Sequence, residues 1–143
     1  MVDQAVPVVC NSLALRQAAR HVSQAYDAAL APLGLRTTQY SILIRLERSG
    51  PWSLGALAAK LVLDRTTLGR TIRPLIRDGL ATMQADPADR RSRVLAITAK
   101  GSALVARATP AWESAQARFD AVYGADKAAR LRRELAQVAS APL

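Results

Sequence analysis

The feature that most limits how this chain can fold is an arginine-bearing amphipathic helix followed at once by a short β-hairpin, within residues 64–98. At about 100° per residue, the polar and apolar side chains of the helix separate onto two faces. The polar face carries Thr66, Arg70, Arg73 and Arg77, and the apolar face carries Leu61, Leu68, Ile72, Leu75 and Ile76. The helix therefore has one side to bury and one side to present to a partner.

The hairpin is predicted from the alternation of apolar and polar residues in 94–98, which can pair with 81–85 across a loop at 87–92. Three arginines, at positions 90, 91 and 93, gather at this loop. Their charges repel one another, and a DNA phosphate backbone or an electronegative minor groove would offset that repulsion. A helix that fits the major groove beside such a hairpin is how a winged helix grips duplex DNA. Taken alone, the arginines of the helix would fit a solvated surface.

The charge of the whole chain supports the same interpretation less specifically. Lysine and arginine number 20 against 11 acidic residues, which gives a formal net charge of +9, and a field of this sign favours polyanions. Most of the basic residues are arginines, a bias that a GC-rich genome would also produce. The placement of the arginines therefore carries more weight than their number.

Helical periodicity and capping residues predict further helices on both sides of this segment. They are 11–31, a helix that begins at a Thr37 or Thr38 cap and ends before 49–51, 54–61 with a Ser53 cap, a long helix from a Thr98 cap to about Gly124, and 126–139. Asp64 is expected to cap the arginine-bearing helix. Pro74 and Pro110 are expected to bend the helices that contain them. The expected fold class is mainly α (α+β).

The terminal helices offer more apolar surface than so small a hairpin domain can cover. A monomer would leave that apolar surface in contact with water, so we expect a two-fold dimer in which a second copy covers it. The alternative is a compact all-helical monomer.

What the chain lacks disfavours several classes of function. No apolar run approaches the roughly 18 to 20 residues needed to span a bilayer, and Met1–Val9 lacks the basic start of a secretion signal, so we expect a cytoplasmic protein. With one cysteine, one histidine and no glycine-rich phosphate loop, the chain offers no intrachain disulfide, metal cage, cofactor site or catalytic frame. An enzyme is therefore not expected.

Two other binding functions stay open as alternatives. Single-stranded nucleic acid binding uses aromatic platforms beside basic residues, and residues 65–93 contain no aromatic side chain. A winged helix that binds proteins without binding DNA is disfavoured by the basic hairpin.

Three features together resemble the transcriptional regulators of the MarR type. They are the helix-turn-helix at 53–79, the sequence Arg77-Asp78-Gly79-Leu80 at the end of the second helix, and the turn DPADRR at 86–91. The resemblance runs across nearly the whole chain. It implies one MarR-type domain over 1–143, with dimerisation helices at 1–33 and 99–143 and a winged helix-turn-helix DNA-binding lobe at 37–98. The implied function is that of a homodimeric repressor that binds a pseudo-palindromic operator and is released by a small molecule.

The resemblance also implies roles for individual residues. Arg65, Thr66, Thr67, Arg70 and Arg73 would face the major groove. Arg91 would probe the minor groove, flanked by Arg90 and Arg93 and steadied by Asp89. The chain departs from the family pattern at Ala88, just before Asp89, where another arginine is common, and at Pro74, which could tilt Arg77 away from DNA.

An effector cleft is implied between the dimer helices and the DNA-binding lobe. The candidate lining residues are Arg16, His21, Tyr26, Gln39, Tyr40 and Trp112, each of which also has an ordinary structural explanation. Cys10 offers an alternative, because peroxide-sensing members of the family carry a reactive cysteine near the start of the first helix. A helix N-terminus or nearby cations would lower the pKa of such a thiol. Oxidant sensing through Cys10 therefore stands beside an inert thiol.

Overall fold

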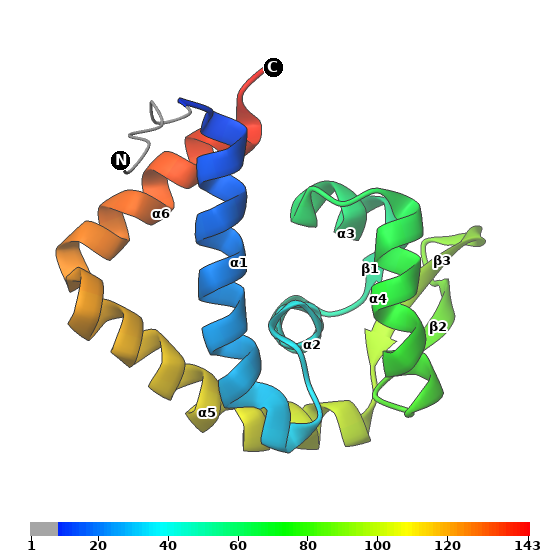
Figure 1. The fold of residues 1–143 in the computed structure, drawn as a ribbon. Coiled ribbons are helices and arrows are strands. Elements are labelled where there is room, and N and C mark those ends of the chain that lie inside the picture. Colours follow the sequence, from blue (N-terminus) through cyan, green and yellow to red (C-terminus); the bar gives the residue numbers. More distant parts are fainter. Residues whose placement is uncertain (1–8) are drawn as a thin grey trace, which may run out of the picture.

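The chain divides into a winged lobe and a set of long helices that extends from it (Figure 1). The computed structural model describes residues 9–143, so residues 1–8 of the segment predicted to dimerise, and most of Met1–Val9, lie outside the described part. The elements in chain order are α1 (Asn11–Leu30), a 3₁₀ turn (Ala31–Leu33), α2 (Thr37–Ser49), β1 (Trp52–Ser53), α3 (Leu54–Leu61), α4 (Arg65–Arg77), β2 (Ala81–Asp86), β3 (Asp89–Ile97), α5 (Ala99–Tyr123) and α6 (Ala125–Ser140). The fold class predicted from the sequence is confirmed.

The winged lobe is built around one apolar core. Helix α2 contributes four buried side chains, those of Tyr40, Ile42, Leu43 and Leu46. Leu57 of α3, Leu68 of α4 and Leu95 of β3 are almost completely buried against them. The sheet has the order β1-β3-β2, with both pairs antiparallel. Burial of this many leucine and isoleucine side chains fixes the positions of α3 and α4 relative to the hairpin.

Capping residues account for most of the helix starts. Ser53, Asp64 and Thr98 each accept a backbone N–H from the first turn of their helix, as predicted. The predicted Thr37 or Thr38 cap of α2 is wrong, because Arg36 occupies that position. The Arg36 N–H donates to Gln39 Oε1 and the Thr37 N–H donates to Asp27 Oδ1 of α1, so a side chain from another helix satisfies the first turn.

The hairpin differs from the prediction in its turn. The loop expected at 87–92 is only Pro87-Ala88, and β3 already begins at Asp89. The pairing shifts register next to the turn, between Ala85 and Asp86, so that extra residues of β3 are accommodated there. Arg90 and Arg91 therefore belong to a strand that extends the wing.

The two prolines leave their helices unbroken. Helix α4 continues through Pro74 to Arg77, with Ile72 and Leu75 buried on either side of the proline. Pro74, which was predicted to bend α4, therefore does not end the helix. Helix α5 continues through Pro110, and it changes direction partway along its length in Figure 1, which fits the bend predicted there.

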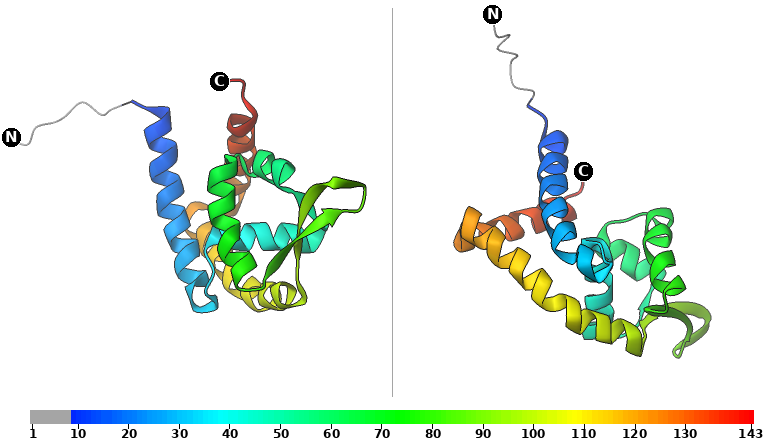
Figure 2. Two further views of the ribbon diagram at one scale, coloured as in Figure 1. Left: turned by 90° about the vertical axis from the view of Figure 1, so that its right-hand side faces the viewer. Right: turned by 60° about the horizontal axis from the view of Figure 1, so that its bottom comes forward.

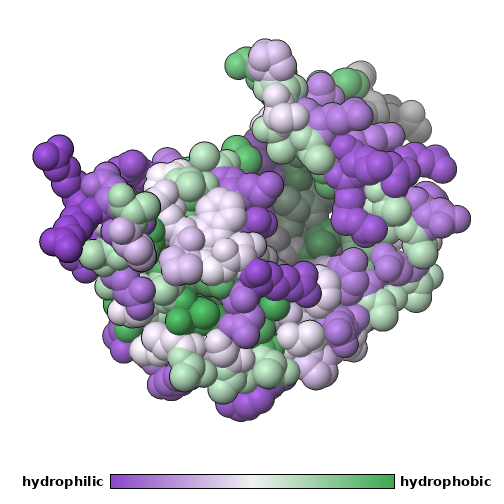
Figure 3. Space-filling view, turned by 180° about the vertical axis from the view of Figure 1, so that it is seen from behind, coloured by the Kyte–Doolittle hydropathy of each residue, from purple (hydrophilic) through white to green (hydrophobic). Residues whose placement is uncertain are grey.

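Helices α1, α5 and α6 form an open triangle beside the lobe (Figure 1; Figure 2, right). Helix α1 packs against α5, and α6 packs against α5. Large apolar side chains remain exposed on these helices: Leu15, Val122, Tyr123, Leu135 and Val138. Figure 3 shows a hollow on this side of the molecule, with hydrophobic residues at its floor and hydrophilic residues along its rim. No helix among residues 9–143 is both long enough and apolar enough to cross a bilayer.

Candidate nucleic-acid interface

Helix α4 is anchored in the lobe by its apolar face. Leu68, Ile72 and Leu75 are buried, and the helix contacts α2, α3 and β2. At its start, Asp64 Oδ1 accepts the Thr67 N–H at 2.6 Å. Hydrogen bonds from the backbone and side chain of Thr67 lower the pKa of Asp64, because they favour the charged carboxylate. The helix is thus fixed along its apolar side and capped at its N-terminal end, which follows the turn after α3.

The opposite face of α4 presents the residues predicted to meet the major groove, and all of them are exposed. They are Arg65, Thr66, Thr67, Arg70 and Arg73. Within residues 9–143, the only ion pair closer than 4.0 Å joins Arg77 to Asp78, so no carboxylate neutralises these arginines. A Cβ added to Gly55 would lie 3.1 Å from Nη2 of Arg65, so the Arg65 side chain lies against the start of α3.

The wing is stabilised by two carboxylates at its tip. Asp86 Oδ1 accepts the Ala88 N–H at 2.9 Å, and Asp89 Oδ1 accepts the Arg91 N–H at 3.0 Å. Such side-chain to backbone bonds hold a tight turn in place. Arg90, Arg91 and Arg93 are all exposed. The Asp89 bond acts on the backbone of Arg91 and leaves its guanidinium group free of an ion pair within the described residues.

The two basic elements lie at the same end of the lobe. In Figure 1 and in the left view of Figure 2, the tip of the β2–β3 hairpin is level with the N-terminal half of α4 and displaced to one side of it. Packing of α4 against β2 fixes this offset. A helix and a strand pair held side by side in this way can meet neighbouring grooves of one duplex.

The C-terminal end of α4 is held by the start of α5. Thr98 Oγ1 donates to the Gly79 carbonyl oxygen at 2.6 Å, and Lys100 Nζ donates to the Asp78 carbonyl oxygen at 2.8 Å. Arg77 Nε donates to Asp78 Oδ1 at 3.0 Å, and this hydrogen bond lowers the pKa of Asp78 and raises that of Arg77. Arg77 is therefore engaged by its neighbour, and Lys100 is a contact that sequence reasoning missed.

The six predicted effector contacts do not share one pocket. Tyr40 and Trp112 line a pocket of about 260 Å³ between α2 and α5. His21 and Tyr26 line a larger groove of about 670 Å³ between α1 and α5. Arg16 and Gln39 line neither of the two, and the Gln39 side chain accepts the Arg36 N–H.

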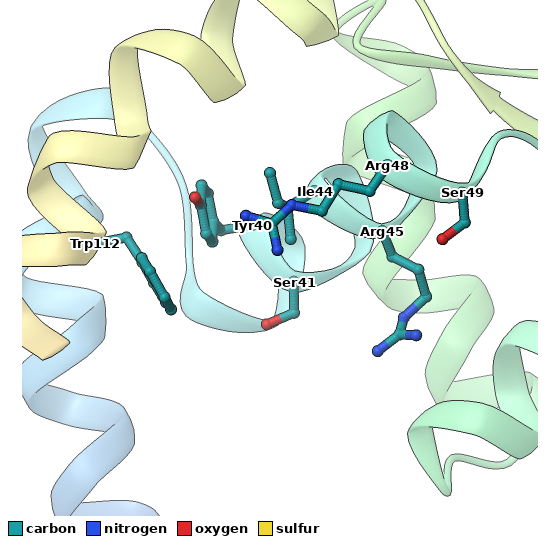
Figure 4. Close-up of a pocket in the computed structure, with 7 residues that line it drawn as sticks. All are labelled: Tyr40, Ser41, Ile44, Arg45, Arg48, Ser49 and Trp112. Atoms are coloured by element: carbon teal, nitrogen blue, oxygen red, sulfur yellow. The ribbon is translucent and has the colours of Figure 1, made fainter. Parts of the chain in front are cut away.

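The pocket between α2 and α5 also contains residues that sequence reasoning missed. They are Ser41, Ile44, Arg45, Arg48 and Ser49 (Figure 4). All five lie on one face of α2, at helical spacing, and that regular spacing is a signal that could have identified them.

The groove between α1 and α5 is largely apolar, with one polar cluster beside it. The Tyr26 hydroxyl donates to Gln116 Oε1, linking the two helices. Burial raises the pKa of Tyr26, and the nearby Asp120 carboxylate raises it further. Asp120 Oδ1 is itself buried without a hydrogen-bond partner among the described residues.

Cys10 stands at the start of α1. Its side chain is exposed, and its Sγ accepts the Leu13 N–H at 3.4 Å, which makes the thiol the N-cap of the helix. Within residues 9–143, no three His, Cys, Asp or Glu side chains lie close enough together to hold a metal ion.

Comparison with known proteins gives consistent similarities. The model of the MarR family matches residues 35–92. The transcriptional activatory protein BadR of Rhodopseudomonas palustris is 32% identical over 114 residues; the match covers 77% of this chain and 61% of BadR, less than two thirds of that relative's length. The transcriptional regulator MosR of M. tuberculosis, solved in complex with DNA, is 39% identical, with a TM-score of 0.79 over 91% of this chain and 93% of MosR.

A further solved structure is that of CouR, a transcriptional repressor bound to a 23-mer DNA duplex. It is 28% identical, with a TM-score of 0.80 over 91% of this chain and 92% of CouR. CouR from Rhodococcus jostii RHA1 has also been solved with p-coumaroyl-CoA, at 26% identity and a TM-score of 0.79 over 92% of this chain and 93% of that one.

Proposed function

The chain belongs to the MarR family of transcriptional regulators, and we propose that it is a homodimer that binds a pseudo-palindromic operator in duplex DNA. The observation that carries the proposal is a set of exposed arginines at one end of the lobe that have no carboxylate partner among the described residues. They are Arg65, Arg70 and Arg73 of α4 and Arg90, Arg91 and Arg93 of the wing. The DNA complexes of MosR and CouR support it, since both proteins share this fold.

In this proposal α4 enters the major groove. Arg70 and Arg73 donate to guanine edges or phosphates, and Thr66 and Thr67 near the helix start donate to phosphate. The Arg65 side chain lies against Gly55 of α3, and in this proposal it contacts the phosphate backbone of the DNA beside the major groove. Arg91 enters the minor groove, with Asp89 fixing its backbone, and Arg90 and Arg93 add to the positive potential there.

The dimer is proposed from the terminal helices. Val122 is 83% exposed and the groove between α1 and α5 is mostly apolar, a surface that a second copy would cover. We assign dimerisation to residues 1–33 and 99–143 and DNA binding to 37–98. A twofold dimer places two recognition helices on successive turns of one DNA face, which is why the operator is expected to be pseudo-palindromic.

We further propose that the protein represses its target and that a small molecule releases it. CouR, a repressor, binds p-coumaroyl-CoA, and the pocket between α2 and α5 offers a place for an effector where the lobe meets the long helices. BadR carries the name of an activator, so the direction of regulation is part of the test. No catalytic activity is assigned.

Selection of binding sites from a random duplex library tests the proposal. The purified protein should enrich an inverted repeat, and nuclease protection should cover both halves of it. Placing the selected site over a promoter in a reporter should lower expression if the protein is a repressor, and higher expression would show an activator. Failure to enrich any duplex would favour a winged helix that binds proteins.

Oxidant sensing through Cys10 is the alternative mode of release. Its support is the exposed thiol at the N-cap of α1, which accepts the Leu13 N–H. Operator release by hydroperoxide should then be lost in Cys10→Ser. Equal release from wild type and Cys10→Ser would leave the small-molecule mode.

A further inference from the structure

The carbonyl groups at the C-terminal end of α4 are satisfied in two different ways. Those of residues 74–76 accept the N–H groups of residues 78–80, which are the next residues of the chain. The Asp78 carbonyl oxygen accepts instead from a distant side chain, the ammonium group of Lys100, at 2.8 Å. Lysine at a helix C-terminus is favourable because it bonds free carbonyl groups and lies at the negative end of the helix dipole. The end of α4 is therefore completed by a residue of α5.

The two side chains that reach this end of α4 from the start of α5 differ in their other contacts. Thr98 Oγ1 donates to the Gly79 carbonyl oxygen and also accepts the Gly101 N–H, so it caps α5 as well. Lys100 is exposed and forms no ion pair within residues 9–143. Its stem passes beside Gly79, where an added Cβ would lie 3.9 Å from Lys100 Cδ. Removing the Lys100 ammonium group therefore breaks a bond to the end of α4 and leaves the cap of α5 intact.

The positive charge of Lys100 also acts on the side chain of Asp78. The hydrogen bond from Arg77 lowers the pKa of Asp78, and the charges of Arg77 and Lys100 lower it further. The carboxylate of Asp78 thus stays charged beside the ammonium group, and both the backbone and the side chain of this residue attract Lys100.

Lys100 lies far from the surface that is proposed to bind DNA. In Figure 1 the start of α5 meets α4 at the end that is away from the hairpin tip. Helix α4 has 13 residues, so at about 1.5 Å per residue its first turn lies roughly 15 to 20 Å from its last. An ammonium group at that distance does not pair with a phosphate beside the first turn. Lys100 is therefore outside the proposed DNA interface.

A bond at one end of a rigid helix controls where the other end points. Over the length of α4, a tilt of roughly 4° about its C-terminal end moves its first turn by about 1 Å. Hydrogen bonds to base edges tolerate only about 0.5 Å in length. Attraction between arginine and phosphate depends on charge and much less on direction. A small tilt of α4 therefore weakens the reading of bases more than it weakens general attraction to DNA.

We propose that Lys100 is a positioning residue for sequence-specific DNA binding, which holds α4 at a fixed angle to α5 through the Asp78 carbonyl group. The inference rests on the proposed function, because it takes α5 as a dimerisation helix and α4 as the recognition helix. In a twofold dimer, the two α4 helices are spaced through the two α5 helices. The bond therefore also fixes the separation of half-sites that the dimer accepts.

Hydrogen exchange of the DNA-free protein tests the bond itself. Lys100→Met keeps an unbranched stem and removes the ammonium group. We expect the amides of residues 78–80 to exchange about tenfold faster in this variant, while the amide of Leu95 in the core strand β3 is unchanged. Lys100→Arg keeps a donor and should restore slow exchange. Arg107→Met removes one charge from an exposed position about two turns further along α5, and as the matched control it should change neither amide set.

Anisotropy titration then tests the consequence for DNA, with the selected operator, a scrambled duplex, and operators whose half-sites are one base pair closer or farther apart. Lys100→Met should bind the operator about tenfold more weakly, bind the scrambled duplex as wild type does, and discriminate less between the half-site spacings. Its dependence on salt should equal that of wild type, because no phosphate contact is lost. Lys100→Arg should recover most of the operator affinity, and Arg107→Met should match wild type.

The inference is overturned if Lys100→Met exchanges like wild type at residues 78–80, or if Leu95 accelerates equally, which would show a general loss of stability. It is also overturned if Lys100→Met loses equal affinity for operator and scrambled duplex with a salt slope shallower by about one unit, the result expected of a direct phosphate contact. Wild-type protein that binds no duplex would contradict the proposed function instead. The exchange measurement contains no DNA and still decides whether Lys100 holds α4.

Discussion

Gly101 packs against the backbone of Leu80 so closely that no side chain fits between them. A methyl group at Gly101 would collide with the Leu80 carbonyl oxygen and would lie 2.8 Å from Cγ1 of Ile97. Gly101 stands in the first turn of α5 and Leu80 follows α4, so this contact joins the proposed recognition helix to the proposed dimerisation helix. Together with the bonds from Thr98 and Lys100, it fixes the direction of α4 relative to α5.

Gly101→Ala should destabilise the protein, by about 1 to 3 kcal/mol, because the added methyl group meets backbone that cannot move aside cheaply. Urea unfolding measures the change. Gly69→Ala is the control, since nothing lies within 4 Å of its added Cβ in the middle of α4. That variant should be stabilised by about 0.5 to 1 kcal/mol. Similar effects of the two substitutions would contradict the close packing at Gly101.

Arg70→Ala should cost about 1 to 3 kcal/mol of operator binding if Arg70 contacts a base edge. The loss should be specific to one position of the site, where discrimination between bases should disappear. Fluorescence anisotropy with the selected operator and its single-base variants measures both effects. A uniform loss on every sequence would show that Arg70 contacts only phosphate.

Arg91→Ala should weaken DNA binding and reduce the dependence of affinity on salt. If Arg91 pairs with phosphate, the slope of log affinity against log salt should become shallower by about one unit. Binding measured across a salt series gives the slope. An unchanged slope would show that Arg91 does not pair with a phosphate group.

Asp89 is expected to act through the backbone of Arg91. Asp89→Ala removes the oxygen that accepts the Arg91 N–H at 3.0 Å and should weaken DNA binding. Asp89→Asn keeps an acceptor oxygen and removes a negative charge near phosphate, so its affinity should equal or exceed that of wild type. If Asp89→Asn binds as weakly as Asp89→Ala, the charge of Asp89 rather than its hydrogen bond is what matters.

The capping role of Asp64 predicts a dependence of stability on pH. Its pKa is lowered in the folded state by the hydrogen bonds from Thr67, so its contribution is present above the unfolded pKa of about 3.9 and is lost as the pH falls through the lower folded pKa. Asp64→Ala should therefore be less stable than wild type at pH 7. The free energies of unfolding of the two proteins should converge as the pH falls below the lowered folded pKa of Asp64. A difference in the free energy of unfolding between wild type and Asp64→Ala that persists in acid would show that the charge of Asp64 is not what stabilises the helix.

The helices and their order follow from local signals in the sequence. The periodicity of Leu68, Ile72 and Leu75 and the caps at Ser53, Asp64 and Thr98 depend on residues within one or two turns of each other. The start of α2 could not be derived in this way, because Asp27 reaches it from α1. Long-range partners of this kind are set by tertiary packing.

The candidate effector residues show the same limit more clearly. Tyr26 and Tyr40 face different cavities because α5 passes between two neighbours, α1 and α2, and offers a separate surface to each. Arg45 and Arg48 become candidate site residues only when the packing of α2 against Trp112 places them in one pocket. The exposed arginines of α4 needed no such information, since amphipathic periodicity alone assigns them to the outer face.

The central claim is most directly tested by anisotropy titration of the purified protein on its selected operator and on a scrambled duplex of equal length, at about 50 and 200 mM salt. We expect affinity for the operator to exceed that for the scrambled duplex by at least about a thousandfold, and affinity for both to fall steeply as salt rises. Equal affinity for the two duplexes, or no binding to either at the lower salt concentration, would contradict the assignment of α4 and the wing to sequence-specific DNA binding.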